Sequence, residues 1–474
     1  LPPGRRRFAL QLSELSLAAA RVPLLRPTLF HAEWVLPVSA PPIHDGGVLV
    51  DERGRIAAVA SRTGLPAPPD AERVELGDAA LLPGLINVHA HPELALFRGA
   101  LEDLDFARWI VRLVSATRRA LGDAEHLAAA RWTTVEALRA GITTLAATES
   151  SAMAAVAVRE AGMRGVVFRE CFGPDAAQAD ASLRDLRRAI DVLRAGECER
   201  VRIGVSPHAP YSVSDTLFAA VARYARREGL PLAIHAAESA AERALVAHGN
   251  GPFAESLGAR GIPTPVRGRS TVDLLERLGV LDARPLLIHC VDVDADDIRR
   301  ISDAGCAVAH CPVANAKLGH GIAPFAALRE AGIPVGLGTD SVGSNNRLDL
   351  LEEARFASLL HRAAAADPTL LPAAELLRLV TLDGARAIGL EGRVGTLETG
   401  KEADLCAVSL AGPHVRPIHD PMVALFHGAR GSDVVLSVVA GRVLYRDGVV
   451  RSVDVAAAGA ALDRAAGRLR EALA

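Results

Sequence analysis

The sequence lacks paired cysteines, a basic excess and any long apolar run. Its six cysteines stand singly, with no CxxC spacing, which argues against a disulfide scaffold and against a cysteine-based zinc site. The formal net charge is −3, so no surface for nucleic acid is indicated. No apolar run approaches the roughly 20 residues that a membrane-spanning helix needs. These absences predict a protein of the reducing cytoplasm with neither a nucleic-acid nor a membrane partner.

What the sequence does contain is a series of eight short segments rich in Val, Ile, Leu and Ala. Segments of this kind are typical of parallel strands that are buried on both faces. Stretches with helical spacing, such as 127–140, lie between them. This alternation predicts an α/β fold, a (β/α)8 TIM barrel. The eight segments are 82–90, 141–148, 164–171, 202–209, 231–238, 285–292, 305–312 and 333–341.

Both ends of the chain carry short alternating runs outside the barrel. Hairpin patterns lie at 47–60 and at 434–445, each with a glycine in its turn. We expect these ends to meet in one small discontinuous β-sandwich domain. An Ala-rich amphipathic helix is predicted at the C-terminus, and the first residues are interpreted as an extension or as the product of a wrongly chosen start. The predicted division is 1–25 extension, 26–80 and 393–454 sandwich, 81–392 barrel and 455–474 helix.

The strongest chemical motif is the segment PGLINVHAHPE, in which His89 and His91 close the first strand. Side chains at positions i and i+2 project to the same side of a strand, so both imidazoles can reach one ion. His235 and Asp340 lie at the ends of the fifth and eighth segments. Catalytic groups of a TIM barrel lie at these C-terminal strand ends, so the four residues predict one divalent metal ion. Three imidazoles and one carboxylate suit zinc, with ferrous iron as the alternative, and leave a position for water.

Each of the last two residues has a simpler explanation when it is taken alone. His235 would then be a core histidine, and Asp340 the N-cap of the following helix. Their coincidence with His89 and His91 at one rim of the barrel favours the metal site.

Two further polar residues at this rim fit proton transfer. Glu238 lies three residues after His235, where the strand gives way to its loop. Metal-assisted hydrolysis still needs a group that carries the proton of the water to the leaving nitrogen, and we predict that Glu238 is this shuttle. His289 ends the sixth strand and could hydrogen-bond the water or a developing oxyanion. A supporting or core role is the alternative for His289.

These residues resemble the amidohydrolase superfamily, and within it the cytosine deaminase and chlorohydrolase-like branch. That branch includes the aminofutalosine, methylthioadenosine and S-adenosylhomocysteine deaminases. The resemblance covers about residues 29 to 450 and rests on PGLINVHAH, SPHAPYSVS, IHAAE, LIHC, HCPVANAKLGHGIAPF and GLGTDS. It implies a mononuclear site with four metal ligands, two groups that handle protons, and a ligand carboxylate that also accepts a proton from the attacking water. The ligands would be His89, His91, His235 and Asp340, the proton-handling groups Glu238 and His289, and the accepting carboxylate Asp340.

Two absences agree with this resemblance. Binuclear relatives carry a bridging carboxylated lysine on a middle strand, and no lysine occurs near the third or fourth segment here. This favours a single metal ion. The combined HxE and PCxxC signature of the cytidine deaminase fold is also missing.

The resemblance also implies substrate contacts. His208 in SPHAPY would contact the ring or the sugar of a nucleoside. Trp109 would lie against the substrate, although a packing role is equally open for it. The loop after the seventh strand would be shaped by His310, Asn315 and Lys317. His320 and the remaining histidines are interpreted as surface or packing residues.

Arginines supply an argument for an anionic substituent on the substrate. Adenosine-type relatives place an acidic residue nine positions after the tryptophan to hold the ribose, and this chain has Arg118 there. Arg169 lies in a segment that could face the mouth of the barrel and is the predicted substrate-binding arginine. One such arginine could bind a carboxylate as a bidentate pair, although solvated surface is the simpler explanation for each. Other candidates are Arg98 and, in the long loop 246–269, Arg260, Arg267 and Arg269.

The sequence therefore predicts metal-dependent hydrolytic deamination of a 6-aminopurine nucleoside such as aminofutalosine. Methylthioadenosine, S-adenosylhomocysteine, guanine and triazines are alternative small-molecule substrates. From another class, the chain could be a catalytically inactive binding or scaffold protein, although such relatives usually lose ligands that this chain retains. Many relatives dimerise, which makes a homodimer an option.

Overall fold

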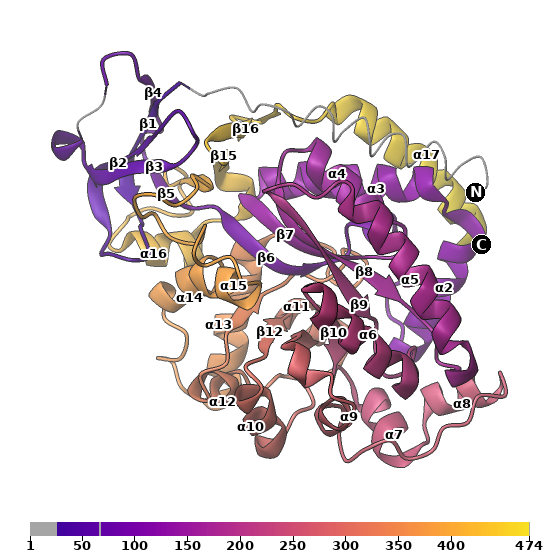
Figure 1. Cartoon of the computed structure of the whole chain (residues 1–474). Helices are drawn as coiled ribbons and strands as arrows, with labels where there is room; N and C mark the ends of the chain where they lie inside the picture. The colour runs from indigo at the N-terminus through magenta and orange to yellow at the C-terminus, as the bar shows by residue number, and fades with distance from the viewer. Residues whose placement is uncertain (1–25, 66–67, 474) are drawn as a thin grey trace.

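The barrel strands lie where the sequence predicts them. The structure is a computed structural model that describes residues 26–65 and 68–473 (Figure 1). Two four-stranded parallel sheets contain all eight predicted segments. The first sheet consists of β6 (Leu85–Ala90), β7 (Ile142–Glu149), β8 (Arg164–Cys171) and β9 (Val201–Pro207). The second consists of β10 (Ala233–Ala236), β11 (Leu286–His289), β12 (Ala307–His310) and β13 (Val335–Leu337).

Backbone contacts join the two sheets at both edges. Val205 of β9 and Leu232, just before β10, form a parallel bridge. At the other edge, the amide of Asp340 donates to the carbonyl oxygen of His89 at 3.0 Å. These contacts place β9 beside β10 and β13 beside β6, which is the strand order of a TIM barrel.

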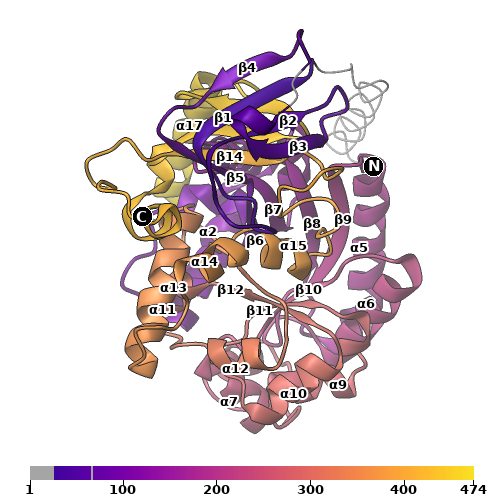
Figure 2. The same ribbon diagram turned by 90° about the vertical axis from the view of Figure 1, so that its left-hand side faces the viewer.

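Helices cover the outside of the barrel strands (Figures 1 and 2). Several begin at side-chain caps. For example, Asp349 accepts hydrogen bonds from the amides of Leu351 and Glu352 at the start of α13. The helices are α2 (Phe106–Ala120), α3 (Asp123–Arg139), α4 (Met153–Glu160), α5 (Ala179–Arg194), α6 (Asp215–Glu228), α7 (Ala240–His248), α8 (Pro252–Gly258), α9 (Thr271–Arg277), α10 (Ala295–Asp303), α11 (Pro312–Lys317), α12 (Phe325–Glu330), α13 (Leu350–Ala365), α14 (Ala373–Leu379), α15 (Leu382–Ala387) and α16 (Pro421–Val423).

Alternate residues of each barrel strand face opposite sides. On β8, Val166 and Phe168 belong to the apolar cluster inside the barrel, together with Ile86 and Ile288. Val167 of the same strand belongs to the larger cluster between strands and helices. This alternation has a period of two residues, and it decides which polar side chains at the strand ends reach the mouth.

The two ends of the chain meet in a nine-stranded sheet beside the barrel (Figure 2). Both predicted hairpins are present in it, and β5 pairs antiparallel with β14, which joins the two ends. Eight of the strands follow one hydrogen-bonded path, and β4 pairs with β1 beside it. Residues from both ends share one apolar core. The strands are β1 (Thr28–Val35), β2 (Ile43–Val50), β3 (Ile56–Ser61), β4 (Glu72–Glu75), β5 (Ala79–Pro83), β14 (Leu405–Ser409), β15 (Val434–Val439), β16 (Arg442–Arg446) and β17 (Val449–Val450).

The C-terminal helix α17 (Val455–Leu473) packs against α2 and α3. The interpretation of residues 1–25 lies outside the described residues, and the predicted domain boundaries stay predictions. Within the described residues, no helix is long and apolar enough to cross a membrane. The predicted cytoplasmic location is a separate question and stays a prediction.

A buried ion pair ties the small domain to the barrel. The guanidinium of Arg164, at the start of β8, is 1% exposed and donates to Asp404 at 2.7 Å and to Glu402 at 2.5 Å. Both acceptors lie just before β14. Because all three charges are buried or nearly so, their mutual pairing is what makes their burial tolerable.

We expect Arg164→Met to lower the free energy of unfolding by about 3 to 5 kcal/mol, because two carboxylates would lose their buried partner. Urea denaturation followed by circular dichroism measures this. Arg62→Met is the control, since Arg62 pairs with Asp45 and Glu75 at the surface and should change stability far less. Equal effects of the two substitutions would contradict the anchoring role of Arg164.

Candidate active site

Four predicted metal ligands converge at the mouth of the barrel. Asp340 Oδ1 lies 3.3 Å from His89 Nε2 and 3.5 Å from His91 Nε2. The Nε2 atoms of His91 and His235 are 3.2 Å apart. The four side chains come from the ends of β6, β10 and β13, so strands far apart in the sequence bring their donor atoms to one point.

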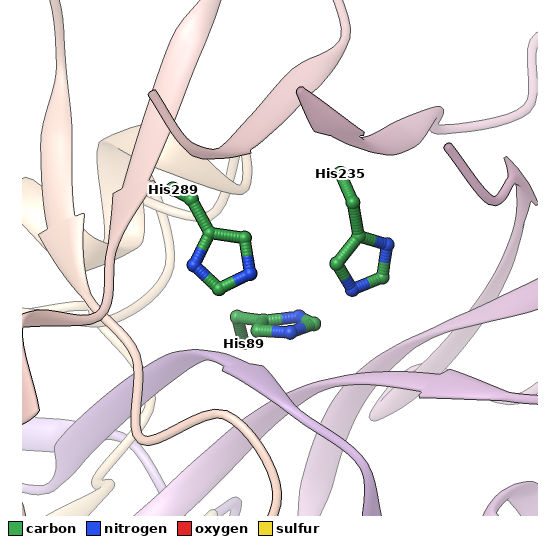
Figure 3. Close-up of side chains that lie close together, drawn as sticks. All are labelled: His89, His235 and His289. Atoms are coloured by element: carbon green, nitrogen blue, oxygen red, sulfur yellow. The ribbon is translucent and has the colours of Figure 1, made fainter. Parts of the chain in front are cut away.

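His289 lies at the same place. Its ring faces those of His89 and His235 (Figure 3), and one nitrogen of each lies within 4.8 Å of the other two. The backbone turns sharply to allow this: His289 and Asp340 have φ values of 77° and 56°. Left-handed backbone at non-glycine residues costs about 1 to 3 kcal/mol and clusters at functional sites.

Hydrogen bonds behind the ligands orient their rings. Nδ1 of His235 lies 3.2 Å from the carbonyl oxygen of His208, to which it can only donate. Nε2 of His235 therefore carries the lone pair that faces the mouth. Nδ1 of His91 lies 3.0 Å from Thr148 Oγ1, and Ser344 Oγ donates to Asp340 Oδ2 at 2.6 Å. Such partners fix the tautomer and direction of metal-binding side chains.

The electrostatics of the cluster favour neutral imidazoles and an ionised carboxylate. Burial, together with the neighbouring His89, lowers the pKa of His91 to about 3. Burial and the adjacent His208 hold the pKa of His235 well below its usual value. Burial alone would raise the pKa of Asp340, but the adjacent His89 and His91 outweigh this effect and lower it. These are the protonation states in which the side chains bind metal.

The residues fit a divalent metal ion. The buried Nε2 of His89 finds no hydrogen-bond partner among the described residues, which is costly for a buried polar atom unless something else satisfies it. Three imidazole nitrogens and one carboxylate oxygen form the donor set that zinc prefers in catalytic sites. An ion held by these four atoms would satisfy the orphaned nitrogen.

Glu238 lies beside this cluster and is held by three side chains. Its Oε1 atom lies 3.5 Å from His289 Nε2 and 3.3 Å from His320 Nε2, and Tyr211 donates to Oε2 at 3.3 Å. Burial alone would raise the pKa of Glu238, but the two histidines outweigh it and lower it. His289 is itself oriented by Asn315, whose Oδ1 lies 2.9 Å from Nδ1.

The interpretation of His320 as a surface residue is wrong, and besides packing it reaches the candidate site. Its side chain is 2% exposed and contacts the carboxylate of Glu238, while the ring of Phe106 meets it edge-on at 4.6 Å. His320 lies in the irregular stretch between α11 and α12. Because no strand or helix pattern covers this stretch, no local sequence pattern indicates the direction of the His320 side chain.

Phe106 lies between Trp109, the predicted substrate-binding aromatic residue, and the side chains beside Glu238. Trp109 on α2 is buried and stacks on Phe106 at 6.3 Å between ring centroids. Phe106, rather than Trp109, is the residue that reaches His320 and Tyr211. The contact of Trp109 with a substrate therefore stays a prediction.

His208 faces the mouth from the end of β9. Its ring lies 4.7 Å from that of His235 and 5.0 Å from that of Phe172, which is 46% exposed at the rim. Burial lowers the pKa of His208 to about 4, so the ring is neutral at pH 7. This position suits the predicted contact with a substrate, which stays a prediction.

The structure gives no support to a substrate-binding role for Arg169. It occupies the face of β8 that it shares with Val167, and the facing residue of β7 is Glu149. Its charge counteracts the effect of burial on the pKa of Glu149. The neighbouring Glu170, which no sequence motif marks, faces the mouth instead.

Three of the other candidate arginines are paired with acidic residues. Arg98 donates to Glu136, Arg267 to Asp215 at 2.7 Å, and Arg269 to Asp297 at 2.6 Å. Arg118 and Arg260 are exposed. The prediction of an anionic substituent, which rested on these side chains, therefore receives no support from the structure.

Comparison with known proteins identifies the family of this chain. The family model described as "Amidohydrolase family" matches residues 80–444. The chain is 36% identical to a 5-methylthioadenosine/S-adenosylhomocysteine deaminase of Moorella thermoacetica, over 89% of this chain and 94% of the relative. It is 33% identical to a 5'-deoxyadenosine deaminase of Methanothermobacter thermautotrophicus, over 87% and 92% of the two chains.

Solved structures show the same fold. An adenosine deaminase from Xanthomonas campestris with bound zinc superposes with a TM-score of 0.84 and 30% identity, and covers 95% of this chain and 100% of that one. The atrazine chlorohydrolase TrzN from Arthrobacter aurescens, complexed with zinc, gives 0.78 and 26%, over 94% and 100%. With a family model that spans most of its length and relatives above 30% identity over nearly all of it, this chain belongs to the amidohydrolase family.

Proposed function

We propose that the protein is a metal-dependent deaminase that hydrolyses the C6 amino group of a 6-aminopurine nucleoside. The observation that carries this proposal is the adjacency of two sets of groups. Four metal-binding atoms converge on one point, and the carboxylate of Glu238, which is not among them, lies within 3.5 Å of His289 beside that point. Hydrolytic deamination needs this combination of an activated water and a separate proton carrier.

The side chains divide the reaction between them. Asp340 accepts a proton from the water as the water attacks C6. Glu238 takes the other proton of the water and delivers it to the ring nitrogen next to C6. The proton held by Asp340 then passes through Glu238 to the departing amine, so that the C–N bond breaks and ammonia leaves with a 6-oxopurine nucleoside as the other product. Asn315 Oδ1 accepts a hydrogen bond from Nδ1 of His289, so Nε2 of the neutral ring accepts a hydrogen bond from the attacking water. A divalent ion on His89, His91, His235 and Asp340 supplies Lewis acidity that lowers the pKa of the water.

We assign zinc as the metal. Neutral imidazoles with one carboxylate suit this ion, and zinc is bound in the adenosine deaminase and the chlorohydrolase that share the fold. Ferrous iron has the same preferences for nitrogen and oxygen ligands and is the alternative.

For the substrate we favour an adenosine with a neutral 5′ substituent. Relatives that match most of this chain are named for methylthioadenosine and 5'-deoxyadenosine, whose 5′ positions carry no charged group, and for S-adenosylhomocysteine, whose tail is a zwitterion without net charge. The candidate arginines for an anionic tail are paired elsewhere or exposed. Aminofutalosine stays in the test panel as the candidate that would require an arginine to move. A homodimer also stays a prediction.

A binding or scaffold protein of this fold would have no reason to keep the whole set of groups. Here the four ligands and Glu238 are all present and in contact with one another or with His289. We therefore place the chain among the enzymes of its family.

Ammonia release across a panel of compounds tests the substrate assignment. The panel holds methylthioadenosine, S-adenosylhomocysteine, 5'-deoxyadenosine, aminofutalosine, guanine and a chlorotriazine, with zinc-loaded protein and with chloride release as the second readout. We expect kcat/KM to be highest for a neutral 5'-substituted adenosine. A clear preference for aminofutalosine would overturn the neutral-tail assignment, and a preference for the triazine would overturn the nucleoside assignment.

A further inference from the structure

Glu170 is a buried carboxyl at the mouth that neither the metal ligands nor the proton carrier account for. It lies next to last on β8, on the same face as Val166 and Phe168, whose side chains point into the barrel. Its side chain is 6% exposed. Among the described residues, Oε1 of Glu170 finds no hydrogen-bond partner.

The carboxyl is aimed at the reacting centre. One of its oxygens lies within 4.8 Å of a nitrogen of His91 and of a nitrogen of His235. On the other side, Oε1 lies 4.0 Å from Nε2 of His208. Arg169, the next residue along the strand, faces the opposite side. A buried carboxyl without a partner is costly, so its position indicates that another molecule supplies the partner.

His208 presents a second acceptor next to Glu170. The hydroxyl of Ser212 donates to the carbonyl oxygen of Ala209 at 3.1 Å. That hydroxyl has one hydrogen, so its contact of 2.7 Å with Nδ1 of His208 requires Nδ1 to be the donor. In the neutral ring, Nε2 then carries a lone pair, and this atom faces Glu170.

We propose that Glu170 and His208 form a pair of acceptors that binds an N–H or O–H donor of the substrate beside the metal. This assignment rests on the proposed function, because it takes the donor from a nucleoside. Burial and the nearby Glu93 raise the pKa of Glu170 to about 8, and a donor at the carboxylate offsets this effect by stabilising the ionised form. At 4.0 Å Glu170 and His208 do not hydrogen-bond each other, so one bound group can donate to both. A nucleoside has two such groups near its ring: the adjacent hydroxyls of the sugar and the amino group on C6.

Equilibrium binding to a protein that does not turn over tests the pair. Dissociation constants of adenosine are measured in Glu238→Gln and in Glu238→Gln combined with Glu170→Gln, both zinc-loaded. We expect the second variant to bind adenosine about 10- to 100-fold more weakly, the effect of one hydrogen bond to a charged acceptor. Glu149→Gln in the same background is the control, because Glu149 is an equally buried carboxyl on the outer face of β7 and should leave the affinity within about twofold.

Two analogues identify the donor. If the sugar hydroxyls donate, the effect of Glu170→Gln disappears with 2',3'-dideoxyadenosine. If the amino group donates, it disappears with purine riboside, which has hydrogen at C6. An equal loss for all three compounds, or no loss for adenosine, overturns the proposal.

Metal content separates this role from direct coordination. Zinc per chain, measured by mass spectrometry, should be the same with and without Glu170→Gln, and a fall in proportion to the lost affinity would make Glu170 a metal ligand and overturn the proposal. The binding readout does not depend on turnover. Failure of the wild-type protein to release ammonia would therefore count against the proposed function, and unchanged binding in Glu170→Gln against the acceptor pair.

Discussion

Replacing Glu238 with glutamine is expected to lower kcat by about 100- to 10,000-fold while the metal stays bound, because glutamine has nearly the same shape but cannot carry a proton. The carboxylate of Glu238 contacts His289, His320 and Tyr211, which are not among the four proposed metal ligands. An amide can keep part of these contacts, so the fold and the metal site should survive the change.

Steady-state ammonia release and zinc content measured on the same preparation check this expectation. Glu149→Gln is the matched control, since Glu149 is buried at the end of a neighbouring strand but faces away from the mouth. Activity of Glu238→Gln above about a tenth of the wild-type value would remove Glu238 from the role of proton carrier.

His235→Ala should lose both metal and activity. Nε2 of His235 lies 3.2 Å from that of His91, and its Nδ1 is held by a backbone carbonyl, so the lone pair of Nε2 points to the place where the other proposed ligands converge. Loss of a residue that merely supports a ligand costs about 10- to 100-fold in metal affinity. We expect the loss of the ligand itself to cost more than about 100-fold, on the same scale.

Competition with a chelator of known affinity measures the zinc dissociation constant. His31→Ala is the control, because His31 is equally buried but lies on β1 of the small domain, near Glu75. It should leave zinc affinity unchanged. If His235→Ala bound one zinc ion per chain as tightly as the wild type, His235 would not be a ligand.

The parts of the site that are predictable from the sequence share one property. His89, His91, His235, His289 and Asp340 each follow a short apolar strand, and parallel strands of a closed barrel end at one rim. Their position along the chain is therefore sufficient to bring them together. The strands themselves are recognisable because burial on both faces demands nearly continuous apolar residues.

At β8, the predicted and the observed side chain at the mouth differ by one position. Side chains alternate between the two faces of a strand, so a change of one position exchanges mouth and exterior. Arg169 was predicted to face the mouth, yet Phe168 points into the barrel and so places Arg169 outside and Glu170 inside. Val166 and Phe168 point into the barrel. Two residues further along the strand, Glu170 lies on the same face, and this spacing is the sequence signal for its position.

The remaining differences depend on tertiary contacts that carry no local pattern. His320 reaches Glu238 from an irregular loop, and no periodicity describes the direction of a loop side chain. Arg267 looks free in the sequence but pairs with Asp215, which is 52 residues away. Pairing over such distances follows from the fold, and it cannot be deduced from composition or spacing.

Titration of zinc into metal-free protein tests the central claim most directly. Ammonia release from methylthioadenosine, with detection of the 6-oxopurine product, is followed as zinc is added. Our account predicts no activity without metal, a linear rise, and saturation at one zinc ion per chain. Activity in the absence of metal, saturation at two ions per chain, or no product at full occupancy would contradict it.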